Sequence, residues 1–350
     1  MKTRNRFCLI VFACLFLCSG FLSCSMQKCN GKAAQQWVEG KAECVMEVNS
    51  RRVLYQAHGD IRLPMASTTK IATCITVLEL CNDLQTKVVI PQTAVGIEGS
   101  SVYLKTGEIY TVEDLLYGLM LRSGNDCATA LALHCCGSID IFAAKMNETA
   151  QKAGALHTNF ENPHGLPSEE HYTTAYDLGL ITCYAMQNPV FCEIVSSKYY
   201  DAKHWKNKNK ILTLYEYGIG VKTGYTKEAG RCLVSAAKKN DMTLVCVVLN
   251  CPTTYERSIM LLEDAFASYR YKKVVSKDQP FVLETAKEKV LGFSRKDLYY
   301  PLLAEEEALL ERKVIAYEKN ALSKKEKDSV GEFSIYLAKQ LLFSGILYKL

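Results

Sequence analysis

The sequence lacks the residue spacing typical of metal sites and the large positive charge typical of nucleic-acid interfaces. Its six histidines are scattered, and none lies at ligand spacing from another histidine or a cysteine pair. We therefore expect neither a metal nor another cofactor. The net charge of +5 is too small to indicate nucleic-acid binding, although it suits an acidic polymer or envelope surface. Charged residues make up 23% of the chain and hydrophobic residues 49%, which excludes wholesale disorder and allows a packed core.

The N-terminus has the pattern of an export signal. A basic start is followed by an apolar run, Phe7 to Leu22, and by the small residues at 23–25. We expect residues 1–25 to be a secretory signal peptide, and the rest of the chain to be exported. A retained membrane anchor is one alternative. Lipoprotein processing at Cys24 is another, although Phe21 fits that pattern poorly. Either alternative would associate the protein with a membrane.

The chain also lacks any Cys-x-x-Cys pair, despite its 16 cysteines. Four of them fall in the N-terminal signal: Cys8, Cys14, Cys18 and Cys24. An exported protein with the 12 that remain would be a candidate for disulfides. Their spacings are irregular, however, and four lie inside apolar runs: Cys74, Cys127, Cys232 and Cys246. We expect most of these cysteines to be buried as small hydrophobic residues.

The first chemical motif is Ser67-Thr68-Thr69-Lys70, at the start of an apolar, helix-like run. Ser67 and Lys70 are one turn apart, so both side chains can share a face. A serine hydroxyl needs a neighbouring base to become a nucleophile, and a partly neutral lysine can be that base. The N–H groups at a helix start would stabilise a developing oxyanion. Taken alone, the motif is a weak signal, and a serine helix cap with a surface lysine is its more common explanation.

The second motif, Ser123-Gly124-Asn125, places a hydroxyl and an amide in a tight loop between two apolar helices. A plain helix connection that contains glycine is the alternative. Capping boxes are predicted at Thr111 with Asp114 and at Thr174 with Asp177, each opening a helix.

The third motif, Lys222-Thr223-Gly224, precedes two strand-like runs, 232–237 and 242–249. On a strand edge, Gly224 would let a ligand approach the backbone closely. A second copy, Lys105-Thr106-Gly107, lies in a turn-rich segment before the second motif. We predict that Lys105 is a solvated turn residue.

The remaining patterns indicate two domains. Residues 42–57 predict a hairpin, and 255–271 predict a final amphipathic helix. From about Ser276 the residue pattern of the chain changes. Near the end, Phe333, Ile335 and Leu337 alternate with less apolar neighbours, as in a strand. We expect a catalytic domain at 36–275 and a small, β-rich domain at 277–350. The basic tract 203–210 is most simply a solvated loop, with contact to an anionic wall polymer as the alternative.

The three motifs in this order are the signature of the penicillin-binding and serine β-lactamase superfamily. From about Ala42 to Lys273 the chain resembles the low-molecular-weight penicillin-binding proteins of the serine D-alanyl-D-alanine carboxypeptidase type. The resemblance implies an α/β fold with an antiparallel sheet flanked by helices, an all-helical lobe and a small C-terminal β-rich domain. It also implies a hydrolase that removes the terminal D-alanine from peptidoglycan pentapeptide stems, is acylated by β-lactam antibiotics, and acts outside a bacterial cell.

The resemblance also assigns roles. Ser67 would be the nucleophile, Lys70 its general base, and Ser123 the proton relay to the leaving amine. Asn125 would hold the substrate peptide. Lys222 would attract the substrate carboxylate and lower the pKa of Lys70 by charge repulsion. The remaining assignments concern the edge strand: Thr223 would bind the carboxylate, Gly224 would leave room for it, and the N–H of Tyr225 would form the oxyanion hole with that of Ser67. Many relatives have histidine where Tyr225 stands.

Other members of the superfamily remain as alternatives. A β-lactamase would need a deacylating glutamate, and the stretch 163–170 lacks the Glu-x-x-Leu-Asn pattern. The motifs do not separate a DD-endopeptidase from a carboxypeptidase. A non-catalytic penicillin-binding sensor would be acylated without turnover, but all motif residues of an enzyme are present. Many proteins of the family it resembles have an arginine at the start of the last helix that helps bind the terminal carboxylate of the substrate. Here that arginine is not assigned, because an ungapped comparison with the family places Thr254 at its position rather than Arg257.

Overall fold

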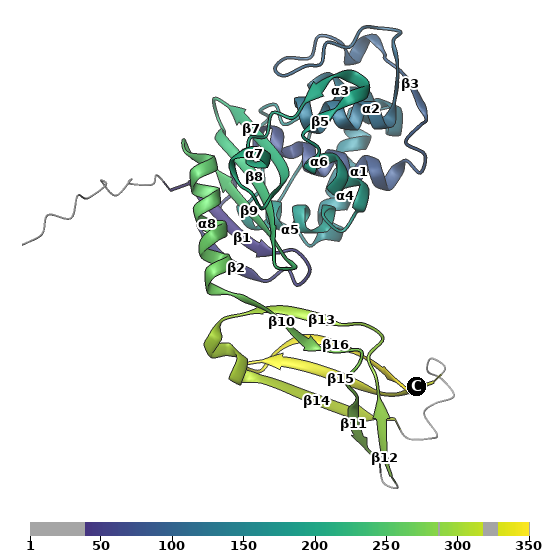
Figure 1. The fold of residues 1–350 in the computed structure, drawn as a ribbon. Coiled ribbons are helices and arrows are strands. Elements are labelled where there is room, and N and C mark those ends of the chain that lie inside the picture. Colours follow the sequence, from purple (N-terminus) through teal and green to yellow (C-terminus); the bar gives the residue numbers. More distant parts are fainter. Residues whose placement is uncertain (1–38, 286–287, 318–327, 350) are drawn as a thin grey trace, which may run out of the picture. The chain divides into compact units, whose positions relative to one another are not determined.

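The computed structural model describes residues 39–285, 288–317 and 328–349. The expected signal peptide lies outside the described residues. A five-stranded antiparallel sheet in the order β2-β1-β9-β8-β7 organises the N-terminal part (Figure 1). Its strands are β1 (Ala42–Glu47), β2 (Val53–Ala57), β7 (Gly218–Thr226), β8 (Gly230–Lys239) and β9 (Met242–Leu249). The predicted hairpin is confirmed, and its β1 pairs with the last of these strands, β9.

Both faces of this sheet are covered, and β9 shows why. Val245, Val247 and Leu249 belong to one hydrophobic cluster, whereas Leu244, Cys246 and Val248 belong to a second. Successive side chains of a strand point to opposite faces, so a continuous apolar run is the pattern of a strand buried on both. Helix α8 (Thr254–Ser268) lies along one face (Figure 1), and α5 (Ala175–Ala185) contacts the other.

A helical lobe follows the first hairpin and ends where the sheet resumes. Its helices are α1 (Lys70–Leu80), α2 (Val112–Tyr117), α3 (Asn125–Cys136), α4 (Ile139–Ala153), α5 and α6 (Pro189–Ser196). Short elements connect them: β3 (Lys87–Val89), β4 (Ile109–Thr111), β5 (Tyr199–Tyr200), β6 (Trp205–Lys206) and α7 (Ile211–Leu214). The four cysteines predicted to be buried all lie in these cores or in the sheet.

The two predicted capping boxes have different outcomes. At Thr111 the box is complete, with reciprocal bonds between Thr111 and Asp114. Thr174 does cap α5 by accepting from the Asp177 N–H, but the return bond is replaced. The Asp177 carboxylate instead accepts from the backbone N–H of His157 and the hydroxyl of Thr158. The tertiary contact with residues 157–158 therefore engages the Asp177 carboxylate, which a complete capping box would bond to the Thr174 N–H.

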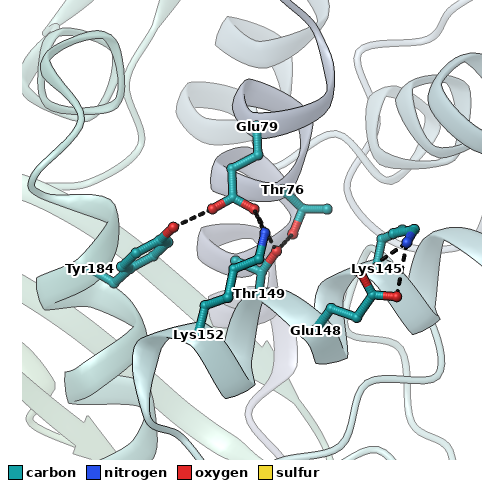
Figure 2. Close-up of polar contacts among 7 residues, drawn as sticks. All are labelled: Thr76, Glu79, Lys145, Glu148, Thr149, Lys152 and Tyr184. Carbon is teal, nitrogen blue, oxygen red and sulfur yellow. Dashed lines mark hydrogen bonds and ion pairs between the residues drawn. The ribbon is translucent and has the colours of Figure 1, made fainter.

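Helix α1 is held against two neighbouring helices by a polar network (Figure 2). The Glu79 carboxylate accepts hydrogen bonds from Thr149 and Lys152 of α4, at 3.0 Å each, and from the hydroxyl of Tyr184 on α5. Thr76, one turn earlier on α1, donates to Thr149 at 3.1 Å. Three side chains of α4 and α5 thus converge on the C-terminal half of the helix that begins with Lys70.

The C-terminal part is rich in strands, as predicted: β10 (Arg270–Val275), β11 (Phe281–Glu284), β12 (Lys289–Gly292), β13 (Leu298–Leu302), β14 (Leu310–Ala316), β15 (Ser329–Leu337) and β16 (Gln340–Tyr348). The predicted extent of the final helix, to Tyr271, is wrong. Helix α8 ends at Ser268 because β10 begins at Arg270 and pairs with β13. The expected boundary between 275 and 277 therefore falls at the end of a strand of this region.

In the described ranges, no single helix is long and apolar enough to cross a membrane, while two bent pairs, α3 with α4 and α5 with α6, reach the required length and composition together.

Candidate active site

Ser67 lies in a short 3₁₀ turn, Ala66–Thr69, immediately before α1, rather than within the α-helix itself. Lys70 is the first residue of α1, and its side chain is completely buried. The Lys70 Nζ lies 3.0 Å from Ser67 Oγ, 2.7 Å from Asn125 Oδ1 and 2.7 Å from the His164 carbonyl oxygen. The first two motifs therefore meet at one amine, although Asn125 is 55 residues from Lys70.

The surroundings of Lys70 favour its neutral form. Burial lowers its pKa well below the usual range, and the positive charge of Lys222 adds to the effect. Charge repulsion from Lys222 was predicted as the cause, but burial is the larger one. A neutral amine keeps two N–H groups, which can donate hydrogen bonds to Asn125 Oδ1 and to the His164 carbonyl oxygen. Its lone pair is then free to face Ser67 Oγ, the geometry that a general base requires.

Ser123 and Lys222 form the opposite wall. Ser123 has a left-handed backbone conformation, φ +62°, at the end of a π-helical turn, Gly118–Arg122. Such a strained residue persists only where its surroundings fix it. The Lys222 Nζ lies 3.0 Å from Ser123 Oγ. Burial, and next the charge of Lys208, lower the pKa of Lys222 to about 7. Lys222 can therefore carry or release a proton near neutral pH.

The edge strand β7 approaches the nucleophile closely at Gly224. A Cβ atom at this position would lie 2.9 Å from the carbonyl oxygen of Met65 and 3.1 Å from the backbone nitrogen of Ser67. Any side chain here would push β7 away from Ser67, so glycine is needed for the close approach. Tyr225, the next residue, has a largely exposed side chain.

A cavity of about 540 Å³ opens between these elements. Ser67, Ser123, Thr223, Gly224 and Tyr225 line it together with seven other residues. Three of the others are cations that the motifs did not indicate: Lys208, Lys210 and Arg231. The basic tract, predicted to be a solvated loop, thus contributes two lysines to the cavity wall. An opening with this charge suits an anionic ligand.

The sequence did not indicate Asp126 as part of the site. This buried carboxylate accepts from the hydroxyl of Ser101 and from the backbone N–H groups of Val102 and Leu104. It thereby folds the segment before β4 toward the loop of Ser123. Next to it, Asn125 donates to the carbonyl oxygens of Glu98 and, through its backbone, Ser100. The only local signal was an acidic residue directly after the second motif.

Two other basic residues lie outside this arrangement. Arg257 forms a buried ion pair with Glu43, with N–O distances of 2.8 and 2.7 Å, so its guanidinium is already engaged. Lys105 is exposed in the turn between Leu104 and β4. As for metals, the described part of the chain holds no group of three or more His, Cys, Asp or Glu side chains that could bind one.

The chain is similar to known proteins of one class. Residues 30–253 match the D-alanyl-D-alanine carboxypeptidase family, peptidase family S11. The chain is 32% identical to D-alanyl-D-alanine carboxypeptidase DacF of Bacillus subtilis over 274 residues, 74% of this chain and 70% of the relative. It is 34% identical to a D-alanyl-D-alanine carboxypeptidase of a Streptomyces species, over 71% of this chain and 92% of that one.

A solved structure extends the likeness to nearly the whole molecule. Penicillin-binding protein 5 of Haemophilus influenzae is 25% identical, with a TM-score of 0.74, over 89% of this chain and 96% of its own. The chain therefore belongs to the D-alanyl-D-alanine carboxypeptidase family. It is a serine-type hydrolase with the fold of the low-molecular-weight penicillin-binding proteins, and both expectations drawn from the three motifs are confirmed.

Proposed function

We propose that Ser67 of this chain attacks the peptide bond between two C-terminal D-alanines and so removes the terminal D-alanine from peptidoglycan pentapeptide stems. The observation that carries the proposal is the buried Lys70 amine, which faces Ser67 Oγ at 3.0 Å while its other two contacts are hydrogen-bond acceptors. A lysine held in this way acts as a base for serine acylation.

The geometry supports the following acylation step. Lys70 takes the proton of Ser67 as Oγ attacks the carbonyl carbon. The backbone N–H groups of Ser67 and Tyr225 would stabilise the oxyanion, since Gly224 lets β7 lie next to Ser67. Asn125 would align the substrate amide. The proton then passes to the leaving D-alanine through Ser123, whose hydroxyl lies beside Lys222.

The substrate must carry a terminal carboxylate, and the cavity supplies positive charge for it. Lys222 and Thr223 would bind this carboxylate directly. Arg257 is paired with Glu43, so the supporting cations in our proposal are Lys208 and Arg231, which line the cavity. A cationic wall attracts an anion before contact and orients it at the edge strand.

Two rival activities remain: a β-lactamase differs from a carboxypeptidase in the step after acylation, and a DD-endopeptidase differs in its substrate. A β-lactamase needs a base that activates water against the acyl-enzyme. In the described chain the direct partners of Lys70 include no carboxylate, and Glu169 and Glu170 are exposed. A long-lived penicilloyl-enzyme is therefore expected. A DD-endopeptidase would use the same groups, and an Escherichia coli D-alanyl-D-alanine endopeptidase is 29% identical over 231 residues.

The test is mass spectrometry of muropeptides after incubation with the purified protein. We expect loss of one D-alanine from pentapeptides, covalent labelling by penicillin, and abolition of both in Ser67→Ala, because this variant removes the hydroxyl that the Lys70 amine contacts. Cleavage of cross-linked dimers but not of pentapeptides would show an endopeptidase. Labelling that persists in Ser67→Ala would refute the assignment of the nucleophile, and labelling without any product would indicate a sensor.

We further propose that the enzyme works outside a bacterial cell, where its substrate lies. The N-terminal signal pattern supports export. An uncleaved or lipidated N-terminus would tether the protein to the membrane, and cleavage after Ser25 would release it. Fractionation of cells that express the full chain, with N-terminal sequencing of the product, separates these outcomes.

A further inference from the structure

Two cysteines from different helices lie in contact far from Ser67 in the sequence. Cys81 caps the C-terminus of α1, and Cys135 lies in the last turn of α3. Their Sγ atoms are 3.4 Å apart, although 54 residues separate them along the chain. Both side chains are partly exposed, whereas seven of the other cysteines in the described ranges are buried. A reagent can therefore reach this pair.

We propose that Cys81 and Cys135 are a disulfide site, which an external disulfide converts to an intramolecular cross-link between α1 and α3. A disulfide needs its sulfurs at about 2.05 Å, so they must approach by about 1.4 Å. Both residues lie at helix ends, where small backbone and side-chain adjustments are easiest. The reactant has the chemistry of oxidised glutathione or of a disulfide oxidoreductase, both typical of oxidising compartments outside the cytoplasm.

The pKa values of the two thiols indicate which cysteine attacks the external disulfide first and which one then closes the cross-link. The S–H of Cys135 stabilises the Cys81 thiolate and lowers the pKa of Cys81 to about 7. The same contact, together with burial, raises the pKa of Cys135. The Cys81 thiolate attacks the external disulfide, forms a mixed disulfide and expels one thiolate. Cys135 then loses its proton to solvent, attacks Cys81 Sγ and expels the second thiolate. The two cysteines lose two electrons, which the external disulfide gains.

The cross-link would join two helices that already meet at the active site. Lys70 is the first residue of α1 and Asn125 the first of α3, and their side chains are in hydrogen-bond contact at 2.7 Å. Cys81 and Cys135 lie at the opposite ends of the same helices. With the disulfide formed, α1 and α3 are connected at both ends, and the segment that carries Ser123 lies within the closed loop. The cross-link thus restrains the unfolded chain and the separation of Lys70 from Asn125.

The competing partner is Cys136, the next residue of α3, which is also partly exposed. It provides the matched control. The experiment treats the purified protein with oxidised glutathione, blocks free thiols by alkylation, and maps the linked peptides by mass spectrometry without reduction. Melting curves are recorded before and after addition of dithiothreitol.

We expect a peptide linked through Cys81 and Cys135 in the wild type and in Cys136→Ser. This linked peptide should be absent from Cys81→Ser and from Cys135→Ser. The oxidised form should melt roughly 4–16 °C above the reduced form, and the two serine variants should lose this difference. A Cys81–Cys136 link, no link at all, or a link without a shift in melting temperature would overturn the proposal. Penicillin labelling of the reduced variants reports separately on the active site, so this result does not depend on the catalytic assignment.

Discussion

At the scale of single residues, the two copies of Lys-Thr-Gly differ in what surrounds the lysine. Lys222 is buried, and its Nζ lies 3.0 Å from Ser123 Oγ, whereas the side chain of Lys105 is exposed in a turn. A buried charge beside the reacting groups contributes to transition-state binding, because little water competes for it. An exposed charge in a turn contributes little.

Lys222→Ala should therefore lower kcat/KM for a peptide ending in D-Ala-D-Ala by about 30-fold to 5,000-fold, about 2–5 kcal/mol. Lys105→Ala, the matched control from the second copy of the motif, should change stability by less than about 0.5 kcal/mol and leave kcat/KM close to wild type. Steady-state kinetics of both variants measures the effect. If Lys105→Ala were the impaired variant, the assignment of the cleft to β7 would be wrong.

At the scale of elements, the position of α1 depends on contacts that its own sequence does not contain. Glu79 connects α1 to α4 and α5 through three hydrogen bonds (Figure 2). Burial alone would raise the pKa of Glu79, but the hydrogen bonds from Tyr184, Lys152 and Thr149 outweigh it and lower the pKa. The carboxylate therefore stabilises the fold in its ionised form.

Glu79→Gln should lower the free energy of unfolding at pH 7 by about 1–3 kcal/mol, because the buried Thr149 hydroxyl and its neighbours lose their charged acceptor. The folded pKa of Glu79 lies below its unfolded value, so its contribution is present above that value and disappears as the pH falls through the folded pKa. The difference from wild type should therefore shrink between pH 7 and pH 3.

Urea unfolding at the two pH values measures this difference. Glu148→Gln is the control, since Glu148 pairs with the partly exposed Lys145 of the same helix (Figure 2), and its substitution should cost no more than about 0.5 kcal/mol. Equal effects of the two substitutions, or an effect of Glu79→Gln that does not depend on pH, would contradict the structural role of the network.

At the scale of the whole molecule, the hydrophobic clusters separate along the chain. The two clusters of the sheet and helical lobe lie before residue 272, whereas the third begins at Val274 and includes Val275, Phe333 and Ile335. All the proposed site residues belong to the first part. Strand β10 is the connection, and it pairs with β13 of the strand-rich region.

A chain that ends at Tyr269 should therefore fold and react with penicillin at a rate within about tenfold of the full-length protein, or about 1.4 kcal/mol of barrier. A chain that ends at Val275 should be less soluble, because it retains β10 without its partner and exposes Val274 and Val275. Acylation rates and size-exclusion chromatography of both chains provide the measurement. Failure of the shorter chain to fold would show that the strand-rich region is required for stability.

The sequence by itself determined the parts of this protein that depend on neighbours along the chain. The spacing of Ser67 and Lys70, the capping box at Thr111 and the apolar run of β9 follow from local geometry and from the alternation of side chains. The order of the three motifs was sufficient to indicate the family and its fold. The buried cysteines followed from the apolar runs around them.

Only the tertiary structure decided how these parts work together. The Lys70 amine has a lowered pKa because folding buries it and brings Lys222 near, and its partners Asn125 and His164 are 55 and 94 residues away. The capping box predicted at Thr174 is incomplete because of another long-range contact: the Asp177 carboxylate accepts hydrogen bonds from the 157–158 segment instead of from the backbone of Thr174. Burial and long-range hydrogen bonds depend on how the whole chain packs, and no local pattern of residues encodes them.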